Sequence, residues 1–578
     1  MFNPRFRAIF VFSFLAAVFI SPVVADSTGS FLWDPTVDNE INTYARVIEL
    51  QHAGDKNGRL LATWEHTYTA GPDTRKTNGT AAEFIIRKSE DEGETWTTLT
   101  TVHDTKGDPK YPYTRFEQPF FFEFPRQMGK YPEGTLLLVG NLLPSNGSTT
   151  NFFAWRSEDH GETWDAVGEW QHGGPSRSGI WEPFLYMDKK GRLVEVFSEE
   201  RQNRMHSQML VNVVSEDGGD TWGDVVKAVA SSRVRDRPGM ASVAKMGNGE
   251  YIMSYEFCGH PHCPVYTKAS KDGVSWNTND TGIRIDTADG IHPVHSPYTI
   301  WDPSTKQVIL SSHYTLLNSN NQPAPENSRS VFINKNYGKG EWFWAPAPWT
   351  VPNGTRYCKA NYSPDLLPLS NGVVRYTAPA GQGNSSFCSE RTGKAPIGAL
   401  PYTANFTAYG QTGWIDFGGK WNVSGDEYGF EPVGSTDAVS VTGSTGWKDY
   451  KITGDVIITG SSGSVGLNVR MSASGTGLNK LKGYAVAVDS ATGKLTTYRH
   501  ADTKTVMHSE AHPGGIQGKK WYHLSVVAKS DKFTVTLAGE QGGSKTTYTV
   551  TDGSFKQGMA GVFGNNGGGN FKNIQITN

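Results

Sequence analysis

Short apolar segments recur at near-regular intervals through roughly the first 400 residues of the chain. Each follows a turn and is rich in Val, Ile, Leu and aromatic residues, which is the pattern of a buried strand. Six of these segments begin at Arg59, Thr135, Arg192, Tyr251, Gln307 and Val373. An earlier strand is expected about 10 to 18 residues before each segment. These earlier strands centre on Arg46, Glu117, Glu182, Arg237, Ser296 and Tyr362.

A turn motif repeats in phase with the strands. Its first copy runs from Ser89 to Trp96 with the pattern Ser-x-Asp-x-Gly-x-Thr-Trp. Full copies begin at Ser157 and Ser215, a copy one residue shorter at Ser270, and a degenerate copy at Asn334. The Ser and Asp side chains can bond to backbone N–H groups of a hairpin turn, Gly supplies a positive φ, and Trp covers the neighbouring strand. We therefore expect the aspartates to be structural.

Together, the strands and turns predict an all-β fold that begins with a six-bladed β-propeller over residues 26–392. Each blade would contain four strands and about 62 residues, with the repeated turn in its outer hairpin. The innermost strands of a propeller converge at the mouth of its channel. Equivalent residues of the six blades should therefore meet there, although they are about 60 residues apart in the chain.

The pattern changes after residue 392. Residues 393–413 contain Pro396 and Pro401 among small residues and are expected to form a linker. Residues 414–578 are rich in Gly, Ser and Thr and contain alternating strand segments. The closing segment, 561–576, resembles the last strands of concanavalin-like jelly rolls. We expect a concanavalin-like β-sandwich, a class in which many domains bind carbohydrate and many others only pack.

The N-terminus has the layout of a secretory signal peptide over residues 1–25. Arg5 and Arg7 precede an apolar run that ends at Ile20, and small residues follow up to Ala25. The alternative is a membrane anchor, but the run is short for a bilayer span. We therefore expect a secreted, extracellular monomer that has no membrane segment after cleavage. Sequons for N-glycosylation begin at Asn78, Asn146, Asn279, Asn353, Asn361, Asn384, Asn405 and Asn422.

Four cysteines, an even number in an exported chain, predict two disulfides. Three pairings are possible, and we expect Cys258–Cys263 and Cys358–Cys388 because each closes a short loop. The segment Cys258-Gly-His-Pro-His-Cys263 also invites a metal-binding interpretation. Its spacing matches no usual zinc pattern, so we expect neither a metal nor a cofactor.

Composition narrows the range of functions. Charged residues make up 19% of the chain and aromatic residues 12%, values that exclude a disordered chain. The 65 glycines and 30 prolines argue against helical bundles. A net charge of −3 provides no broad basic surface for nucleic acid or anionic lipid. A neutral ligand is therefore favoured.

The residues expected at the channel mouth form an acidic and aromatic ring. They are Arg46, Glu65, His66, Glu117, Asn141, Trp181, Glu182, Glu199, Arg237, Tyr255, Glu256, His295, His313, Tyr314, Tyr362 and Tyr376. Aromatic rings stack on sugar faces, and paired carboxylates perform acid/base or nucleophilic work, so the ring predicts a glycoside hydrolase. The histidines are equally compatible with ordinary strand positions.

Glu182 and Glu256 are the strongest catalytic candidates. Each follows an aromatic residue in an otherwise apolar segment, and burial there would raise the pKa of one of them toward the range of a general acid. The alternative is a buried structural acid bonded to Arg237 or to a backbone N–H. Glu199, one strand along from Glu182, is the reserve acid.

The chain resembles the sialidase superfamily of Asp-box propellers in its repeated turns and in the combination of Glu256 with Tyr362. Sialidases also use three arginines for the substrate carboxylate, and Arg46 resembles the first. No convincing second or third is present: Arg375 is a poor match, and Glu65-His66 stands where sialidases tend to have Glu-Arg.

The better resemblance is to the fungal exo-α-1,5-L-arabinanases of glycoside hydrolase family ninety-three, over roughly residues 30–390. The supporting segments are Tyr44-Ala-Arg-Val-Ile48, Ile180-Trp-Glu-Pro-Phe184, Arg235-Asp-Arg-Pro-Gly-Met240, Tyr255-Glu256 and Asn361-Tyr-Ser-Pro-Asp365. The resemblance implies a retaining enzyme in which Glu182 is the acid/base, Glu256 the nucleophile and Tyr362 its neighbour. It implies release of arabinobiose from chain ends of arabinan, including the side chains of pectin. Carboxyl groups of retaining enzymes are about 5–5.5 Å apart. We assign substrate binding to Arg46, His66, Glu117, Trp181, Glu199, Arg237, Tyr255 and Tyr314.

Two other functions remain open at this stage. One is a sialidase-type exo-glycosidase that uses Tyr362 and Glu256 as a nucleophile pair, which would need an arginine cluster. The other is a non-catalytic, glycan-binding propeller, which would bind sugar without releasing products.

Overall fold

The computed structural model describes residues 29–35, 40–69, 75–76, 82–106, 110, 112–353, 358–382, 388–433, 437–473, 481–501, 503–540 and 543–578. The expected signal peptide, residues 1–25, and the sequons at Asn78 and Asn384 lie outside these ranges. No helix in the described ranges is long and apolar enough to cross a membrane.

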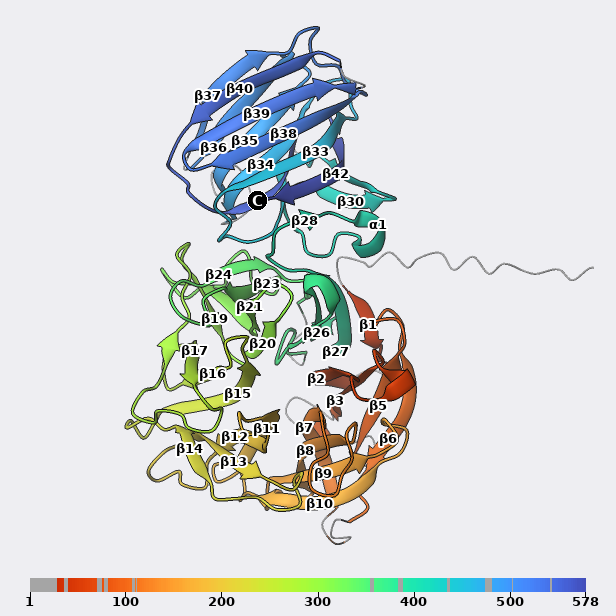
Figure 1. The fold of residues 1–578 in the computed structure, drawn as a ribbon, viewed down its shortest axis with the longest axis vertical. Coiled ribbons are helices and arrows are strands. Elements are labelled where there is room, and N and C mark those ends of the chain that lie inside the picture. The colour runs from red at the N-terminus through yellow and green to blue at the C-terminus, as the bar shows by residue number, and fades with distance from the viewer. Residues whose placement is uncertain are drawn as a thin grey trace, which may run out of the picture.

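The N-terminal part of the described chain is a β-propeller, in which groups of antiparallel strands are arranged radially about a common centre (Figure 1). The first three groups are β2 Glu40–Glu49, β3 Leu60–Thr69, β5 Glu83–Ser89 and β6 Thr97–His103; β7 Tyr113–Glu123, β8 Leu136–Pro144, β9 Asn151–Ser157 and β10 Asp165–His172; β11 Ile180–Met187, β12 Leu193–Glu199, β13 Met209–Ser215 and β14 Val226–Val229. The next three are β15 Arg237–Lys245, β16 Tyr251–Cys258, β17 Val265–Ser270 and β18 Ile283–Arg284; β20 Tyr298–Asp302, β21 Gln307–Ser311, β23 Ser330–Asn334 and β24 Phe343–Pro346; β25 Asp365–Pro368, β26 Val373–Gly381 and β27 Cys388–Pro396. The remaining elements here are β1 Ser30–Trp33, β4 Arg75–Lys76, β19 Ile291–Val294, β22 Tyr314–Leu317 and the 3-10 turns Gly54–Lys56 and Ser370–Gly372.

The ring closes between the last group and the first. Strand β27 pairs with β26 and β1 and runs parallel to β2, where Cys388 lies opposite Ile41. The disulfides are Cys358–Cys388, at this closure, and Cys258–Cys263. The expected pairing of the cysteines is therefore confirmed, as are the all-β fold and the propeller.

Hydrogen bonds within the repeated turns follow the expectation from sequence. Ser89 Oγ accepts the Gly93 N–H at 2.7 Å, and the Asp91 carboxylate accepts the Thr95 N–H and hydroxyl at 2.9 and 2.6 Å. The same arrangement recurs in the copies that contain Asp159, Asp217 and Asp272. Both carboxylate oxygens are used inside each turn, so these aspartates are structural.

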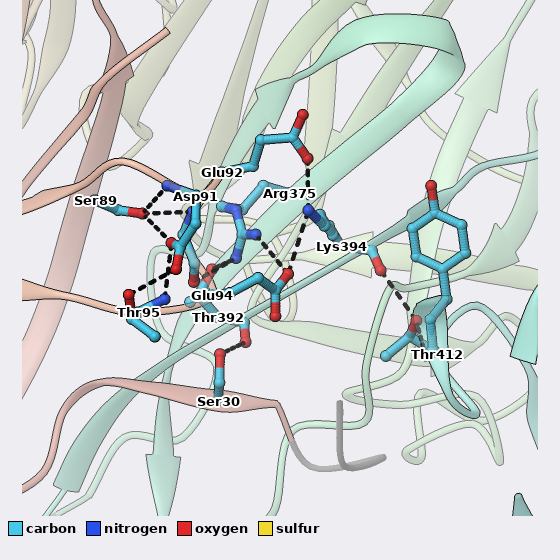
Figure 2. A network of polar contacts seen from close by, with 12 residues as sticks. Ser30, Ser89, Asp91, Glu92, Glu94, Thr95, Arg375, Thr392, Lys394 and Thr412 are labelled. Atoms are coloured by element: carbon cyan, nitrogen blue, oxygen red, sulfur yellow. Dashed lines mark hydrogen bonds and ion pairs between the residues drawn. The ribbon is translucent and has the colours of Figure 1, made fainter. Parts of the chain in front are cut away.

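The first repeated turn, Ser89–Trp96, also binds residues of the last blade at the point where the propeller closes, an interaction called the closure clamp below (Figure 2). Arg375 of β26 is buried, and its guanidinium donates to Gly93 O at 3.3 Å and to Thr392 Oγ1 at 3.0 Å. Glu94 lies 3.5 Å from the Arg375 guanidinium and 3.3 Å from Lys394 Nζ. Similar clamps join Arg59 to Glu162 and Arg156 to Gly218. Each of these turns thus holds an arginine from the preceding blade.

A residue with positive φ interrupts each innermost strand or the segment leading into it. These residues are Tyr44 (62°), Gln118 (53°), Glu182 (55°), Met240 (53°), Ser296 (37°) and Ser363 (51°). In the first four strands the position coincides with a shift of register against the neighbouring strand. Such conformations cost about 1–3 kcal/mol each and concentrate at functional sites.

The C-terminal part is a β-sandwich of an eight-stranded and a seven-stranded sheet. The first sheet contains β28 Tyr402–Thr403, β30 Lys420–Ser424, β31 Glu427–Glu431, β33 Tyr450–Ile458, β38 Trp521–Lys529, β39 Lys532–Gly539, β40 Lys545–Thr551 and β42 Gly569–Thr577. The second contains β29 Ile415–Phe417, β32 Ala438–Thr442, β34 Ser464–Ala473, β35 Leu481–Asp489, β36 Lys494–His500, β37 Lys504–Ala511 and β41 Met559–Asn565. The range expected as a linker, 393–413, is instead divided between the two domains. Strand β27 of the propeller extends into this range as far as Pro396. Strand β28 pairs with β42 of the sandwich, and helix α1, Phe406–Tyr409, comes directly after β28.

The sandwich packs directly against the propeller near β24 (Figure 1). Trp342 and Trp344 share one buried apolar cluster with Ile415 and Phe417 of the sandwich. The Arg329 guanidinium donates to Asp416 O at 3.1 Å and lies 4.7 Å from the centre of the Phe417 ring. The two domains are therefore joined by a common core.

Candidate active site

Glu182 lies at the positive-φ position of β11. Its N–H donates to Gln118 Oε1 of the preceding blade at 2.8 Å, and its Oε2 is buried without a hydrogen-bond partner in the described part of the chain. Burial raises the pKa of this carboxyl to about 8, the charge of Glu256 adds to the rise, and a hydrogen bond with Ser198 opposes it. Glu182 is therefore protonated at neutral pH, as a general acid must be.

Glu256 lies near the end of β16, in different surroundings. Its Oε2 accepts the Ser296 N–H at 2.9 Å and lies 3.3 Å from His295 Nδ1. Its Oε1 is 3.5 Å from Cys258 Sγ, a disulfide sulfur that carries no hydrogen to donate. The two carboxyl groups therefore have different surroundings: Glu182 is buried with an unpartnered oxygen, whereas Glu256 is contacted by Ser296 and His295. This contrast matches the roles of a general acid and a nucleophile.

Tyr362 lies within electrostatic range of both glutamates. Burial holds the pKa of Tyr362 well above its usual range, and the nearby carboxyl groups of Glu256 and Glu182 add to the rise. The hydroxyl lies 3.6 Å from Met240 Sδ, and the ring packs edge-on against His313. Tyr362 is therefore a neutral neighbour of both acids.

Arg46 is committed to the protein interior. It donates to Ser363 O at 3.1 Å and Ser363 Oγ at 2.8 Å, and it stacks over the Tyr44 ring at 4.2 Å. Its charge opposes the effect of burial on Asp365 and Glu390, whose pKa values are nevertheless raised, that of Asp365 to about 6. Arg46 thus balances buried acids around the channel.

The expected residue Arg237 lies in a polar cluster beside Trp181. Glu200 accepts hydrogen bonds from Trp181 Nε1, at 3.1 Å, and from the Arg237 guanidinium, whose side chain is 40% exposed. Glu199, the reserve acid, is ion-paired with Arg201 and almost fully buried. Glu117 is ion-paired with Arg115. Neither Glu199 nor Glu117 is available as a free acid.

His66, Tyr255 and Tyr314, which were also expected to bind substrate, have three different environments. His66 is 3.2 Å from Glu40 and packs among Trp33, Trp64 and Tyr68. Tyr255 lies in the apolar core, because successive strand residues alternate sides and its neighbour Glu256 takes the other side. Tyr314 is 38% exposed and stacks on His313 with ring centres 3.7 Å apart. Of the three, only Tyr314 presents an accessible ring.

In the described ranges, one group of potential metal ligands has its donor atoms within 4.8 Å of one another: Cys258, Cys263 and His295. The two sulfurs are bonded to each other, so neither is a thiolate that could bind an ion. The metal-binding interpretation of this segment therefore has no support.

The sequence reasoning missed Gln118, Ser198 and Met240, which surround Glu182. Ser198 Oγ is 3.3 Å from Met240 N, and Gln118 N donates to Glu65 Oε1 at 3.0 Å. A signal was present, because proline follows four of the six positive-φ residues, namely Gln118, Glu182, Ser296 and Ser363. Proline disfavours the helical conformation in the residue before it and is confined to edges or bulges within sheets.

Comparison with solved structures identifies close relatives of the propeller. A GH93 α-L-arabinofuranosidase of Fusarium graminearum, solved with arabinobiose, is 28% identical with a TM-score of 0.53, over 64% of this chain and 97% of that one. A Penicillium chrysogenum α-L-arabinanase, also solved with arabinobiose, is 31% identical with a TM-score of 0.52, over 63% of this chain and 97% of that one.

The C-terminal part has a different relationship. Residues 432–578 match the model of the galactocerebrosidase C-terminal lectin domain. The search of curated proteins found no match. Since the similarity to the arabinanase extends over nearly all of that enzyme's length, the chain belongs to glycoside hydrolase family GH93 and carries an additional lectin-like domain.

Proposed function

We propose that the protein is a retaining exo-α-1,5-L-arabinanase, built on six blades and secreted after removal of residues 1–25. The observation that supports this most directly is the contrast between Glu182, whose pKa burial raises to about 8, and Glu256, whose Oε2 accepts the Ser296 N–H and lies 3.3 Å from His295 Nδ1. Two carboxyl groups whose different surroundings give them different roles are the arrangement that glycosidases use.

The reaction proceeds by double displacement. A Glu256 oxygen attacks the anomeric carbon while Glu182 donates its proton to the departing glycosidic oxygen, which breaks the glycosidic bond and forms a glycosyl ester. Glu182, now ionised, then removes a proton from water, and the hydroxide oxygen displaces Glu256. Tyr362 remains neutral between the acids, and Tyr314, Trp181 and Arg237 offer surfaces for the sugar.

The two GH93 relatives were solved with arabinobiose, which supports a disaccharide product from an arabinan chain end. The lectin-like domain supports a role in holding the polymer, such as arabinan or the side chains of pectin. The alternative sialidase activity is disfavoured, since Arg375 serves the closure clamp and Tyr362 has too high a pKa to be a ready nucleophile.

The test is the product profile on linear debranched arabinan. We expect arabinobiose as the first product, released with retained anomeric configuration in proton NMR, and no release by Glu256→Ala. Random shortening of the polymer would contradict exo action, and an inverted product would contradict the nucleophile. Turnover of a sialyl fluorogenic substrate would favour the sialidase alternative, whereas sugar binding without any product would favour a non-catalytic propeller.

A further inference from the structure

The Glu256 carboxylate is held through one of its two oxygens. Oε2 accepts the Ser296 N–H at 2.9 Å and has His295 Nδ1 at 3.3 Å, whereas Oε1 faces the disulfide sulfur of Cys258 at 3.5 Å. The sulfur cannot donate a hydrogen bond. Oε1 therefore keeps the lone pairs that an attack on carbon requires.

The backbone that presents His295 is held from both sides. His295 and Ser296 have φ values of 59° and 37°, which are unfavourable for residues other than glycine. The His295 N–H donates to Cys263 O at 3.0 Å, and the His313 N–H donates to His295 O at 3.1 Å. Surroundings that fix such a turn this firmly are typical of functional sites.

The disulfide connects this turn to the strand of Glu256. Cys258 lies two residues after Glu256 on β16, and its partner Cys263 supplies the carbonyl that binds His295. The loop closed by this disulfide therefore fixes both the carboxylate and the imidazole. Movement of one relative to the other would require the loop to deform.

Of the two neighbouring histidines, His295 and His313, it is His295 that contacts the Glu256 carboxylate. The ring centres of His313 and His295 are 6.2 Å apart, and burial lowers the pKa of His313 to about 3, so it is neutral. A hydrogen bond from His295 to Oε2 requires hydrogen on Nδ1. Both the Nδ1–H neutral tautomer and the imidazolium satisfy that requirement.

We propose that His295 is a positioning residue for the nucleophile: its Nδ1–H and the Ser296 N–H hold Oε2, so that Oε1 is the oxygen that attacks the anomeric carbon. The assignment rests on the proposed function of Glu256. It predicts that His295 acts on formation of the glycosyl ester and not on protonation of the leaving group. Misplacement of a reacting group by about 1 Å can cost about 100-fold in rate.

The experiment compares His295→Leu with His295→Asn, whose amide keeps an N–H donor near the position of Nδ1. His260→Leu is the control, because His260 lies in the same disulfide loop with 29% exposure. We expect His295→Leu to lower kcat/KM by up to about 100-fold while arabinobiose binding and Tm change little. His295→Asn should recover most of the loss, and His260→Leu should match the wild type.

A substrate with a better leaving group distinguishes the role of His295 from that of the acid Glu182. With an activated dinitrophenyl arabinoside, formation of the glycosyl ester needs little protonation, so kcat/KM of Glu182→Gln should recover even though water attack stays slow, whereas kcat/KM of His295→Leu should remain impaired. The inference is overturned if His295→Leu retains wild-type kcat/KM, if His295→Asn gives no rescue, or if the activated substrate restores His295→Leu.

A measurement without turnover tests the contact itself. The ¹⁵N NMR signals of His295 should show a hydrogen-bonded Nδ1–H that changes in Glu256→Gln. A neutral Nε2–H tautomer in the wild type would overturn the inference whatever the activity. If the wild type cleaves no arabinoside, the proposed function fails, and the NMR result still decides whether His295 binds Glu256.

Discussion

The roles of the two central glutamates follow from what surrounds each carboxyl group. Glu182 is buried, and one of its oxygens has no hydrogen-bond partner among the described residues, so the neutral acid is favoured. Glu256 Oε2 accepts the Ser296 N–H at 2.9 Å and has His295 Nδ1 at 3.3 Å. Both residues follow an aromatic residue in an apolar segment, and that pattern alone cannot distinguish them. The difference arises from Ser296 and His295, which lie 40 and 39 residues further along the chain.

Glu182 should set the basic limb of the pH–rate profile. The pKa of its carboxyl is raised to about 8, so the active protonated form is present below that pH and is lost as the pH rises through it. We expect kcat/KM on arabino-oligosaccharides to fall above pH 8. Glu182→Gln should lose about 10²- to 10⁴-fold and show no basic limb near 8. A wild-type profile that is flat to pH 9.5 would contradict the assignment.

Substitution of Ser198 tests the pKa of the Glu182 carboxyl without removing that carboxyl. Its hydrogen bond stabilises the Glu182 carboxylate and so lowers the pKa of Glu182. Ser198→Ala removes that bond, and a hydrogen bond of about 1 kcal/mol corresponds to about 0.7 pH unit. The basic limb should therefore move upward by about half to one unit. Measurement of kcat/KM from pH 5 to 10 decides, and a downward shift would show that Ser198 does not act on the carboxylate.

At the scale of single elements, the repeated turns and the interrupted strands were predictable to different degrees. The side chains of Ser89 and Asp91 bond to Gly93 and Thr95 within one hairpin, so the local pattern was sufficient to predict the turn. The clamp from Arg375 was not predictable, because it joins residues 282 positions apart. In the structure Arg375 bonds to Gly93 O and Thr392 Oγ1, in agreement with its poor match to a sialidase arginine.

The closure clamp should contribute measurably to stability. Arg375→Met removes the buried charged donor to Gly93 O and Thr392 Oγ1, although Gly93 O keeps its hydrogen bond from Trp96 Nε1, and Glu94 is 34% exposed and can be solvated. We expect the free energy of unfolding to fall by about 2–3 kcal/mol, measured by chemical denaturation. Activity per folded molecule should not change. Arg156→Met at the equivalent clamp is the matched variant, and a loss below about 0.5 kcal/mol in both would show that these clamps act only as surface pairs.

At the scale of the whole molecule, the sequence predicted two β domains but not how they meet. The change in strand pattern near residue 392 and the absence of the repeated turn beyond it were visible in local composition. The apolar cluster shared by Trp344 and Phe417 was not, since each residue also fits the core of its own domain. Tyr255 was likewise misplaced by sequence reasoning alone. It precedes Glu256 in the strand, but successive strand residues point to opposite faces, so its side chain lies in the core.

The shared core predicts that the two domains unfold together. Phe417 is buried, packs in the cluster that contains Trp344, and lies under the Arg329 guanidinium of the propeller. Phe417→Ala should therefore destabilise both domains by removing about 3–5 kcal/mol of packing, although the residue belongs to the sandwich. In differential scanning calorimetry we expect one transition for the wild type and one transition at lower temperature for the variant. Phe533→Ala, in the sandwich core away from this cluster, is the comparison. Two separate transitions, of which Phe417→Ala shifts only one, would show that the domains are thermodynamically independent.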